Sequence, residues 1–141
     1  MPKHIYQHAS CVSIDGQGVL LLGKSGAGKS DLALRLIHAG AMLVADDQVM
    51  ITLANGQLLA SSPEKIIGLI EARGVGLLTL HHRQNVPLVL AVKLVERKAV
   101  SRLPEPTFFD CFDLQVPLLS LHAFDDSVCA KIFLYLVSHR S

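Results

Sequence analysis

The sequence predicts an α/β fold in which a central, partly parallel sheet is flanked by helices. The main observation is the segment "VLLLGKSGAGKSDLALRLIHAGAMLVADD", where a buried strand, a glycine-rich loop, a helix and a second buried strand follow one another. This order describes a βαβ unit. A second observation is the length of 141 residues, which allows one domain with a substantial core and is too short for two of ordinary size. We therefore expect residues 1–141 to form a single domain.

The first half of the chain contains the elements of the βαβ unit. Residues 8–14 ("HASCVSI") alternate loosely and predict a strand, and the following "DGQG" has the chemistry of a turn. Residues 19–23 form a short apolar run that is typical of a strand buried on both faces. Asp31–Ala39 has leucines at helical spacing and is followed by Gly40 as a stop. Residues 41–47 predict the second strand, which should end at the same edge of the sheet as the first.

The second half of the chain adds strands and a final helix. Residues 49–61 predict a hairpin, because an Asn-Gly pair separates two apolar segments. Residues 62–74 begin with Ser-Pro, which suits the start of a short helix. Residues 87–95 ("PLVLAVKLV") predict a strong strand and residues 116–121 a weaker one. The periodicity of residues 125–139 predicts a helix that ends the chain.

Composition excludes several classes of partner. Thirteen Lys and Arg balance twelve Asp and Glu, and no basic run is present, so we expect no nucleic-acid partner. No apolar run approaches the ~20 residues needed to cross a bilayer, and the first residues do not suit a signal peptide. We therefore expect a cytoplasmic protein that does not bind membranes. Since 50% of its residues are apolar, we also expect part of its surface to be buried between subunits of a homo-oligomer.

The glycine-rich loop "GKSGAGKS" satisfies the phosphate-binding pattern G-x-x-x-x-G-K-[ST]. Its glycines let backbone N–H groups surround a phosphate, and the helix that opens behind it adds its unpaired N–H groups. Lys29 is expected to reach the outer phosphates and the Ser30 hydroxyl to bind Mg²⁺. The residues expected to bind the nucleotide are Gly23, Lys24, Ser25, Gly26, Ala27, Gly28, Lys29 and Ser30.

Two adjacent carboxylates, Asp46 and Asp47, end the second strand of the βαβ unit. The simplest interpretation of Asp46 is a carboxylate that holds Mg²⁺ at the end of an apolar strand. Adjacent carboxylates repel each other, and this repulsion makes it easier for one of them to accept a proton. One of the pair could therefore act as a general base toward a hydroxyl. The alternative is a solvated turn without a function. The topology favours a site, because it brings the pair to the edge of the sheet where the phosphate loop lies.

Several motifs together identify a resemblance to a known family. "HASCVSI", "GVLLLGKSGAGKSDLALRLI", "LVADD" and "EARGVG" resemble the catalytic domain of HPr kinase/phosphorylase, in a short form without the N-terminal domain of longer members. The resemblance implies an ATP- and Mg²⁺-dependent kinase that phosphorylates a serine of HPr, the phosphocarrier protein of the sugar phosphotransferase system. In this family the same site can also catalyse dephosphorylation, and hexamers are usual.

The resemblance also implies roles for individual residues. Asp46 is expected to be the base for the serine hydroxyl and Asp47 to lie toward the metal, with His8 close to both. Glu71 matches a metal-binding glutamate of the family, and the neighbouring arginine at position 73 belongs to the same motif. Arg102, in "SRLPE", falls where the family has an active-site arginine.

Two segments depart from the family pattern. Residues 77–85 ("LLTLHHRQN") replace an extended loop, and Asp125 and Asp126 stand where the family has a basic loop. Both departures fall on elements associated with partner binding and assembly. Two alternatives to an HPr kinase therefore remain: a P-loop kinase for another protein or a small metabolite, and a nucleotide-sensing module without catalysis. GTPases are disfavoured because the chain has no N-K-x-D motif.

Overall fold

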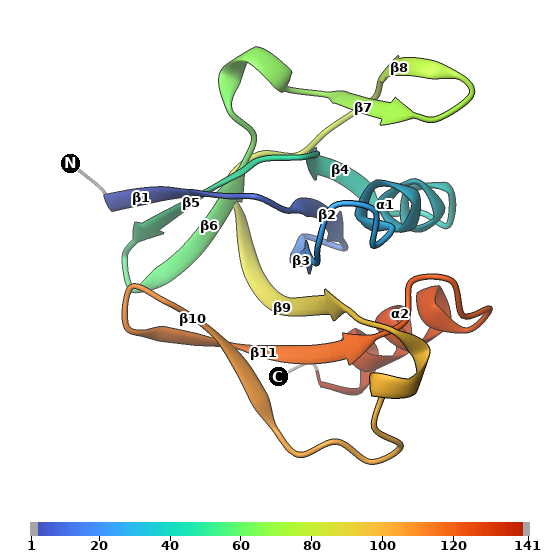
Figure 1. Ribbon diagram of the computed structural model, residues 1–141. Coiled ribbons are helices and arrows are strands. Elements are labelled where there is room, and N and C mark those ends of the chain that lie inside the picture. The colour runs from blue at the N-terminus through green and yellow to red at the C-terminus, as the bar shows by residue number, and fades with distance from the viewer. Residues whose placement is uncertain (1–2, 140–141) are drawn as a thin grey trace.

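The computed structural model describes residues 3–139 and contains a nine-stranded sheet, a separate two-stranded hairpin and two α-helices (Figure 1). The sheet has the strand order β1-β5-β6-β9-β3-β2-β4, and β11 pairs with both β9 and β10. The elements are β1 (Lys3–Gln7), β2 (Ser10–Ile14), β3 (Gln17–Leu22), α1 (Lys29–His38), β4 (Met42–Ala45), β5 (Val49–Ala54), β6 (Gln57–Ser61), the 3₁₀ helix η1 (Glu64–Ile66), β7 (Leu69–Ala72), β8 (Gly76–Thr79), β9 (Val86–Leu94), the 3₁₀ helix η2 (Arg97–Ala99), β10 (Thr107–Cys111), β11 (Leu114–Leu121) and α2 (Val128–Ser138).

The centre of the sheet is partly parallel, which confirms the predicted α/β fold. Strand β9 pairs in parallel with β3 on one side and with β11 on the other. Strand β2 lies antiparallel between β3 and β4, so these two strands run in the same direction. The carboxyl ends of β3, β4, β9 and β11 therefore meet at one edge of the sheet, as predicted for the βαβ unit.

The central strands are buried on both faces, as the apolar run in β3 predicts. Leu21 belongs to a core that also contains Leu36 of α1 and Ile132 of α2. Its neighbour Leu20 points to the other face, into a second core that includes Ala91. Successive side chains of a strand point to opposite faces, which explains this division. Both α-helices contribute to the first core, and they lie on the same side of the sheet in Figure 1. The buried residues of the second core come from strands, except for Ala9, which lies between β1 and β2.

Most predicted elements are present with small shifts at their ends. The helix expected over 31–39 begins at Lys29, where the phosphate-binding pattern places its start, and ends at His38. The helix expected over 125–139 is α2, which begins at Val128. The hairpin over 49–61 is β5 and β6, and both Asn55 and Gly56 of its turn have positive φ, as a type I′ turn requires.

The prediction of a short helix over residues 62–74 is wrong. Only the three residues of η1 are helical, and β7 follows and pairs with β8. Gly68 separates the two elements with a φ of +75°, and its carbonyl accepts a hydrogen bond from the Leu80 N–H at 2.8 Å. Beyond it, Ile70 is buried and Glu71 is exposed, which is the alternation of a strand.

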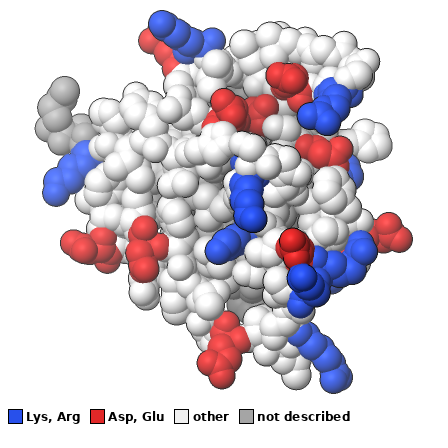
Figure 2. Space-filling view, in the orientation of Figure 1, with Lys and Arg blue, Asp and Glu red and all other residues white. Residues whose placement is uncertain are grey.

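The charged surface, the helices and the cysteines bear on the partners and bonds that the sequence allows. On the face drawn in Figure 2, acidic and basic side chains are interspersed, and neither kind gathers into a broad patch. Within residues 3–139, no helix is long and apolar enough to cross a bilayer. All three cysteines are free thiols; Cys11 and Cys111 are buried and Cys129 is half-buried.

Candidate active site

The phosphate-binding loop connects the carboxyl end of β3 to the first residue of α1. Gly26 and Gly28 have φ angles of +85° and +101°, a left-handed conformation that glycine adopts without strain. The Ala27 N–H donates to the Lys24 carbonyl at 3.0 Å and closes the turn between them. Gly28 is the N-cap of α1 and has no side chain to satisfy the first N–H groups of the helix. These groups are therefore available to bind an anion.

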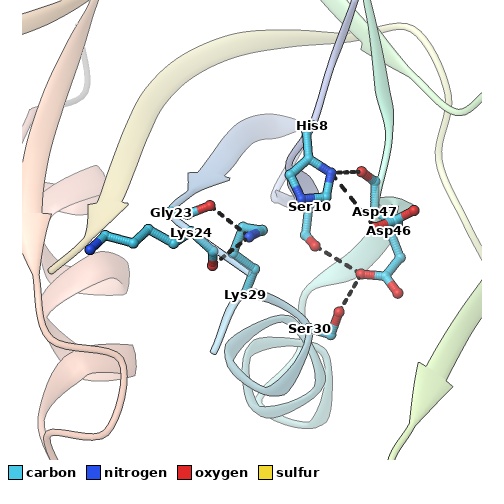
Figure 3. A network of polar contacts seen from close by, with 8 residues as sticks. All are labelled: His8, Ser10, Gly23, Lys24, Lys29, Ser30, Asp46 and Asp47. Atoms are coloured by element: carbon cyan, nitrogen blue, oxygen red, sulfur yellow. Dashed lines mark hydrogen bonds and ion pairs between the residues drawn. The ribbon is translucent and has the colours of Figure 1, made fainter. Parts of the chain in front are cut away.

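Lys29 lies inside this loop rather than on its surface. Its side chain is only 8% exposed, and its ammonium group donates to the Gly23 carbonyl at 2.7 Å and to the Lys24 carbonyl at 3.0 Å (Figure 3). An ammonium group has three protons, so these two bonds leave one that can reach a ligand. The loop therefore holds a positive charge in a fixed position at its centre.

Asp46 follows β4 and joins the loop to two other elements. Its side chain is 8% exposed, and its Oδ1 accepts hydrogen bonds from the Ser30 hydroxyl at 2.7 Å and from the Ser10 hydroxyl at 2.8 Å (Figure 3). Ser30 comes from the first turn of α1 and Ser10 from the start of β2. The structure thus brings Ser30 and Asp46 together across the βαβ unit. A hydroxyl and a carboxylate so placed are the groups that bind Mg²⁺ in P-loop proteins.

Asp47 has the opposite environment to its neighbour. Its φ of +68° turns the chain, and its side chain is 80% exposed. The Nδ1 atom of His8 lies 3.0 Å from the Asp47 backbone carbonyl and 3.7 Å from the Asp47 Oδ1. A carbonyl oxygen only accepts hydrogen bonds, so Nδ1 carries the proton and Nε2 of a neutral His8 keeps its lone pair. The two adjacent carboxylates therefore point to different places, Asp46 inward to the serines and Asp47 outward beside His8 (Figure 3).

Two of the expected site residues, Glu71 and Arg102, lie on elements other than the loop and the two strands of the βαβ unit, although β7 packs against α1. Glu71 is exposed on β7, and Arg73 is exposed in the turn that leads to β8, at the top of Figure 1. Arg102 is exposed in the segment between η2 and β10, at the bottom of the same view. Within residues 3–139, no group of three His, Cys, Asp or Glu side chains is close enough to hold a metal ion. The Ser30 hydroxyl contacts Asp46, and the roles expected for Asp47 and Glu71 at the metal stay predictions.

Ser10 is a site residue that the sequence analysis missed. It lies in a strand where every residue is buried, so hydrophobic periodicity gives it no special position. Its place beside Asp46 depends on the pairing of β2 with β4, where the register shifts between Cys11 and Val12. A polar residue at the start of a buried strand, next to the βαβ unit, is the only signal that the sequence offers.

We expect Ser10→Ala to destabilise the protein by about 1.5–3 kcal/mol, because a buried hydrogen bond to a charged group is lost. Urea unfolding measures this change. Ser13→Ala is the matched control, since Ser13 is buried in the same strand but is paired with Met42, at the opposite end of β4 from Asp46. Equal unfolding midpoints for Ser10→Ala and the unmodified protein would show that the bond contributes nothing to folding.

Comparison with known proteins identifies the family. Residues 1–120 match the model of a family described as "HPr Serine kinase C-terminal domain". The chain belongs to this family. It is 40% identical over 126 residues to an HPr kinase/phosphorylase of Thermoanaerobacter sp. (strain X514), an alignment that covers 81% of this chain. It is 48% identical over 90 residues to the HPr kinase/phosphorylase of Caldicellulosiruptor bescii, which covers 63% of this chain. The resemblance drawn from the motifs is therefore confirmed.

The fold also matches a solved structure. "Structure of the Hpr(Ser) kinase/phosphatase from Coxiella burnetii" superposes with a TM-score of 0.84 and 27% identity, over 96% of this chain and 90% of that chain. The curated relatives are longer: the alignments cover 41% of the Thermoanaerobacter protein and 29% of the Caldicellulosiruptor protein. The chain thus aligns with less than half the length of each of these two HPr kinase/phosphorylases.

Proposed function

We propose that this chain is an ATP-dependent protein-serine kinase that transfers the γ-phosphoryl group of ATP to a serine of HPr. The observation that carries the proposal is the contact between Ser30 and Asp46 beside Lys29, with the exposed carboxylate of Asp47 next to them. The membership of the family supports HPr as the substrate and ATP with Mg²⁺ as the phosphoryl donor.

The loop residues are proposed to bind the polyphosphate of ATP. The N–H groups at the start of α1 surround the phosphates, and the remaining proton of Lys29 is donated to the outer ones. Ser30 and Asp46 are proposed to hold Mg²⁺, because a hydroxyl oxygen and a carboxylate are the hard ligands that this ion prefers. When bound, Mg²⁺ neutralises charge on the phosphates. Ser10 then acts as a positioning residue, since its hydroxyl fixes the orientation of the Asp46 carboxylate.

We assign the role of general base to Asp47, in the reverse order to the one expected from the sequence. The Oδ1 of Asp46 already accepts hydrogen bonds from two hydroxyl groups and Asp46 is buried, so it is poorly placed to receive a substrate hydroxyl. The carboxylate of Asp47 is exposed and can reach a serine on another protein. His8 supports this arrangement, because its Nδ1–H donates a hydrogen bond to the Asp47 carbonyl and so holds the turn in place.

The proposed reaction is tested by incubating the protein with γ-labelled ATP, Mg²⁺ and purified HPr, followed by mapping of the labelled residue. Label on one serine of HPr, and none on HPr in which that serine is replaced by Ala, is the expected result. Nucleotide binding without transfer to HPr or to any other added protein would favour the nucleotide-sensing alternative. Label on a metabolite would favour a small-molecule kinase.

The same residues are suited to dephosphorylation of HPr by inorganic phosphate. In the proposed dephosphorylation, inorganic phosphate attacks the phosphoserine and pyrophosphate is the product. A protonated Asp47 gives its proton to the serine oxygen as the bond from that oxygen to phosphorus breaks and the new bond to phosphate forms, since the general base of phosphorylation can act as the general acid of dephosphorylation. Release of labelled pyrophosphate from serine-phosphorylated HPr and phosphate measures this activity directly.

We further propose that the chain assembles into a homo-oligomer. Leu134 and Val137 are more than 60% exposed on α2 although both are large and apolar. Burying them between subunits would remove this surface from water. Sedimentation at micromolar concentration is expected to show a species several times the 15.3 kDa mass of the chain. A monomer at every concentration would contradict the proposal.

A further inference from the structure

The segment between β11 and α2, residues 122–127, lies directly against the phosphate-binding loop. A Cβ atom added to Gly28 would lie 2.9 Å from Cζ of Phe124 and 3.0 Å from Cβ of Ala123. Arg35 of α1 donates a hydrogen bond from Nη2 to the Ala123 carbonyl. The match to the family model ends at residue 120, before this segment. The segment nevertheless packs against Gly28 of the loop.

Phe124 is the unusual residue of this segment. It is 55% exposed, while Ala123 beside it is buried. Its ring is held by its neighbours: the Arg35 guanidinium carbon lies 5.9 Å from the ring centroid, and the His122 ring packs edge-on at 5.8 Å between centroids. Folding alone does not require a large apolar ring to stay open to solvent next to a phosphate site. A fixed and exposed aromatic ring is instead the kind of surface on which a nucleobase stacks.

The order of the strands indicates that a nucleobase would lie on this side of the loop. Strands β9 and β11 lie on one side of β3, whereas β2 and β4, which carry Ser10 and precede Asp46, lie on the other. The γ-phosphoryl group must approach the exposed carboxylate of Asp47, beyond the end of β4. The other end of the polyphosphate, which carries the nucleoside, then points toward β9 and β11. Phe124 is the exposed aromatic side chain that contacts the loop from that side.

Two further contacts keep the segment in place. The Nε of Arg97 in η2 donates to Oδ1 of Asp125 at 2.8 Å, and this bond lowers the pKa of the Asp125 carboxyl. The Nδ1 of His122 lies 2.9 Å from the Val95 carbonyl. The negative charge of Asp125 is thus paired with Arg97 rather than directed at the phosphates. The ring of Phe124 is held between two anchored neighbours, so little entropy is lost when a ligand stacks on it.

We propose that Phe124 stacks on the purine base of ATP and so supplies affinity that the phosphate-binding loop does not. This inference rests on the proposed nucleotide-dependent function. It names a binding residue on a different element from the loop and on the opposite side from the two aspartates. It also gives the β11–α2 segment a role, where its two acidic residues had only indicated a departure from the family.

The test separates binding of the base from binding of the phosphates. Affinities of Mg²⁺-ATP and of inorganic tripolyphosphate are measured by calorimetry for the unmodified protein and for Phe124→Ala. Stacking of a base on an aromatic ring is worth enough that ATP should bind about ten- to a hundredfold more weakly to Phe124→Ala. Tripolyphosphate, which has no base, should bind with unchanged affinity. Phe108→Ala is the control, because Phe108 is 46% exposed on β10 and is not in contact with the loop glycines.

A second variant gives a direct optical signal. The chain contains no tryptophan, so Phe124→Trp introduces a single fluorophore at this position. It should keep the affinity for ATP, and its emission should change on addition of ATP but not of tripolyphosphate. Equal weakening of ATP and tripolyphosphate binding in Phe124→Ala would overturn the inference, because Phe124 would then only support the loop. Unchanged ATP affinity would overturn it as well. Failure of the unmodified protein to bind either ligand would instead refute the proposed function.

Discussion

Lys29→Ala is expected to lower kcat for phosphoryl transfer to HPr by at least about 10²–10³-fold, because a fixed charge that stabilises the developing negative charge is lost. It should also weaken Mg²⁺-ATP binding by about ten- to a hundredfold, since a charge-assisted hydrogen bond to phosphate contributes about 1.5–3 kcal/mol. The effect is large because Lys29 is buried in the loop and anchored by the Gly23 and Lys24 carbonyls. No other lysine among residues 3–139 is buried.

The measurement for Lys29→Ala is steady-state transfer of labelled phosphate, with calorimetry for ATP affinity. Lys3→Ala is the matched control, because Lys3 is an exposed lysine on β1, at the far edge of the sheet from the loop. A melting curve close to that of the unmodified protein would show that the fold survives the loss of two internal hydrogen bonds. Near-normal turnover of a folded Lys29→Ala protein would contradict the assignment of the loop as the ATP site.

The parts of the fold that could be predicted from the sequence depend on local patterns. Helix α1 follows from its leucine spacing and from Gly40, and the β5–β6 turn from Asn55 and Gly56. The run in β3 indicated burial on both faces, and the βαβ order placed the loop and the aspartates at one edge. Each of these conclusions needs only a few consecutive residues and a known rule of chain geometry.

The parts that could not be predicted depend on contacts between distant residues. Strand β1 is exposed along most of its length and is held only by pairing with β5, so its own sequence has little hydrophobic pattern. The β10–β11 hairpin turns at Phe112 and Asp113, both with positive φ, without the usual glycine. Residues 62–74 have a helical start but form a strand, because Gly68 and the partner β8 override the local preference.

The candidate site could likewise be predicted from the sequence only where local motifs and topology determine it. The motif located Lys29 and Ser30, and topology placed Asp46 near them. What the sequence does not encode locally is the turn at Asp47, whose φ of +68° directs the second carboxylate away from the first. Asp tolerates this left-handed conformation, but so do many turn residues, and nothing in "ADD" distinguishes the inward carboxylate from the outward one. Ser10 and Phe124 lie next to these residues only through the packing of β2 and of the β11–α2 segment.

The final prediction concerns the two aspartates. Replacing each with asparagine is expected to lower activity for a different reason. In Asp47→Asn the proposed base is lost while the loop is untouched. General bases contribute about 10²–10⁴-fold, so kcat should fall by that factor while the affinity for Mg²⁺-ATP stays close to normal. Asp113→Asn is the matched control, because Asp113 is also an exposed aspartate with positive φ, in the β10–β11 turn.

Asp46→Asn should instead act through the metal. An asparagine keeps an oxygen that can accept the Ser10 and Ser30 hydroxyls, so the fold should survive. The negative charge is lost, and with it most of the attraction for Mg²⁺. The Mg²⁺ concentration that gives half-maximal activity should therefore rise at least about tenfold, and saturating Mg²⁺ should restore part of kcat in Asp46→Asn but none in Asp47→Asn. The opposite pattern would restore the order expected from the sequence, with Asp46 as the base. Full turnover in both variants would mean that neither carboxylate takes part, and that the pair is only a turn.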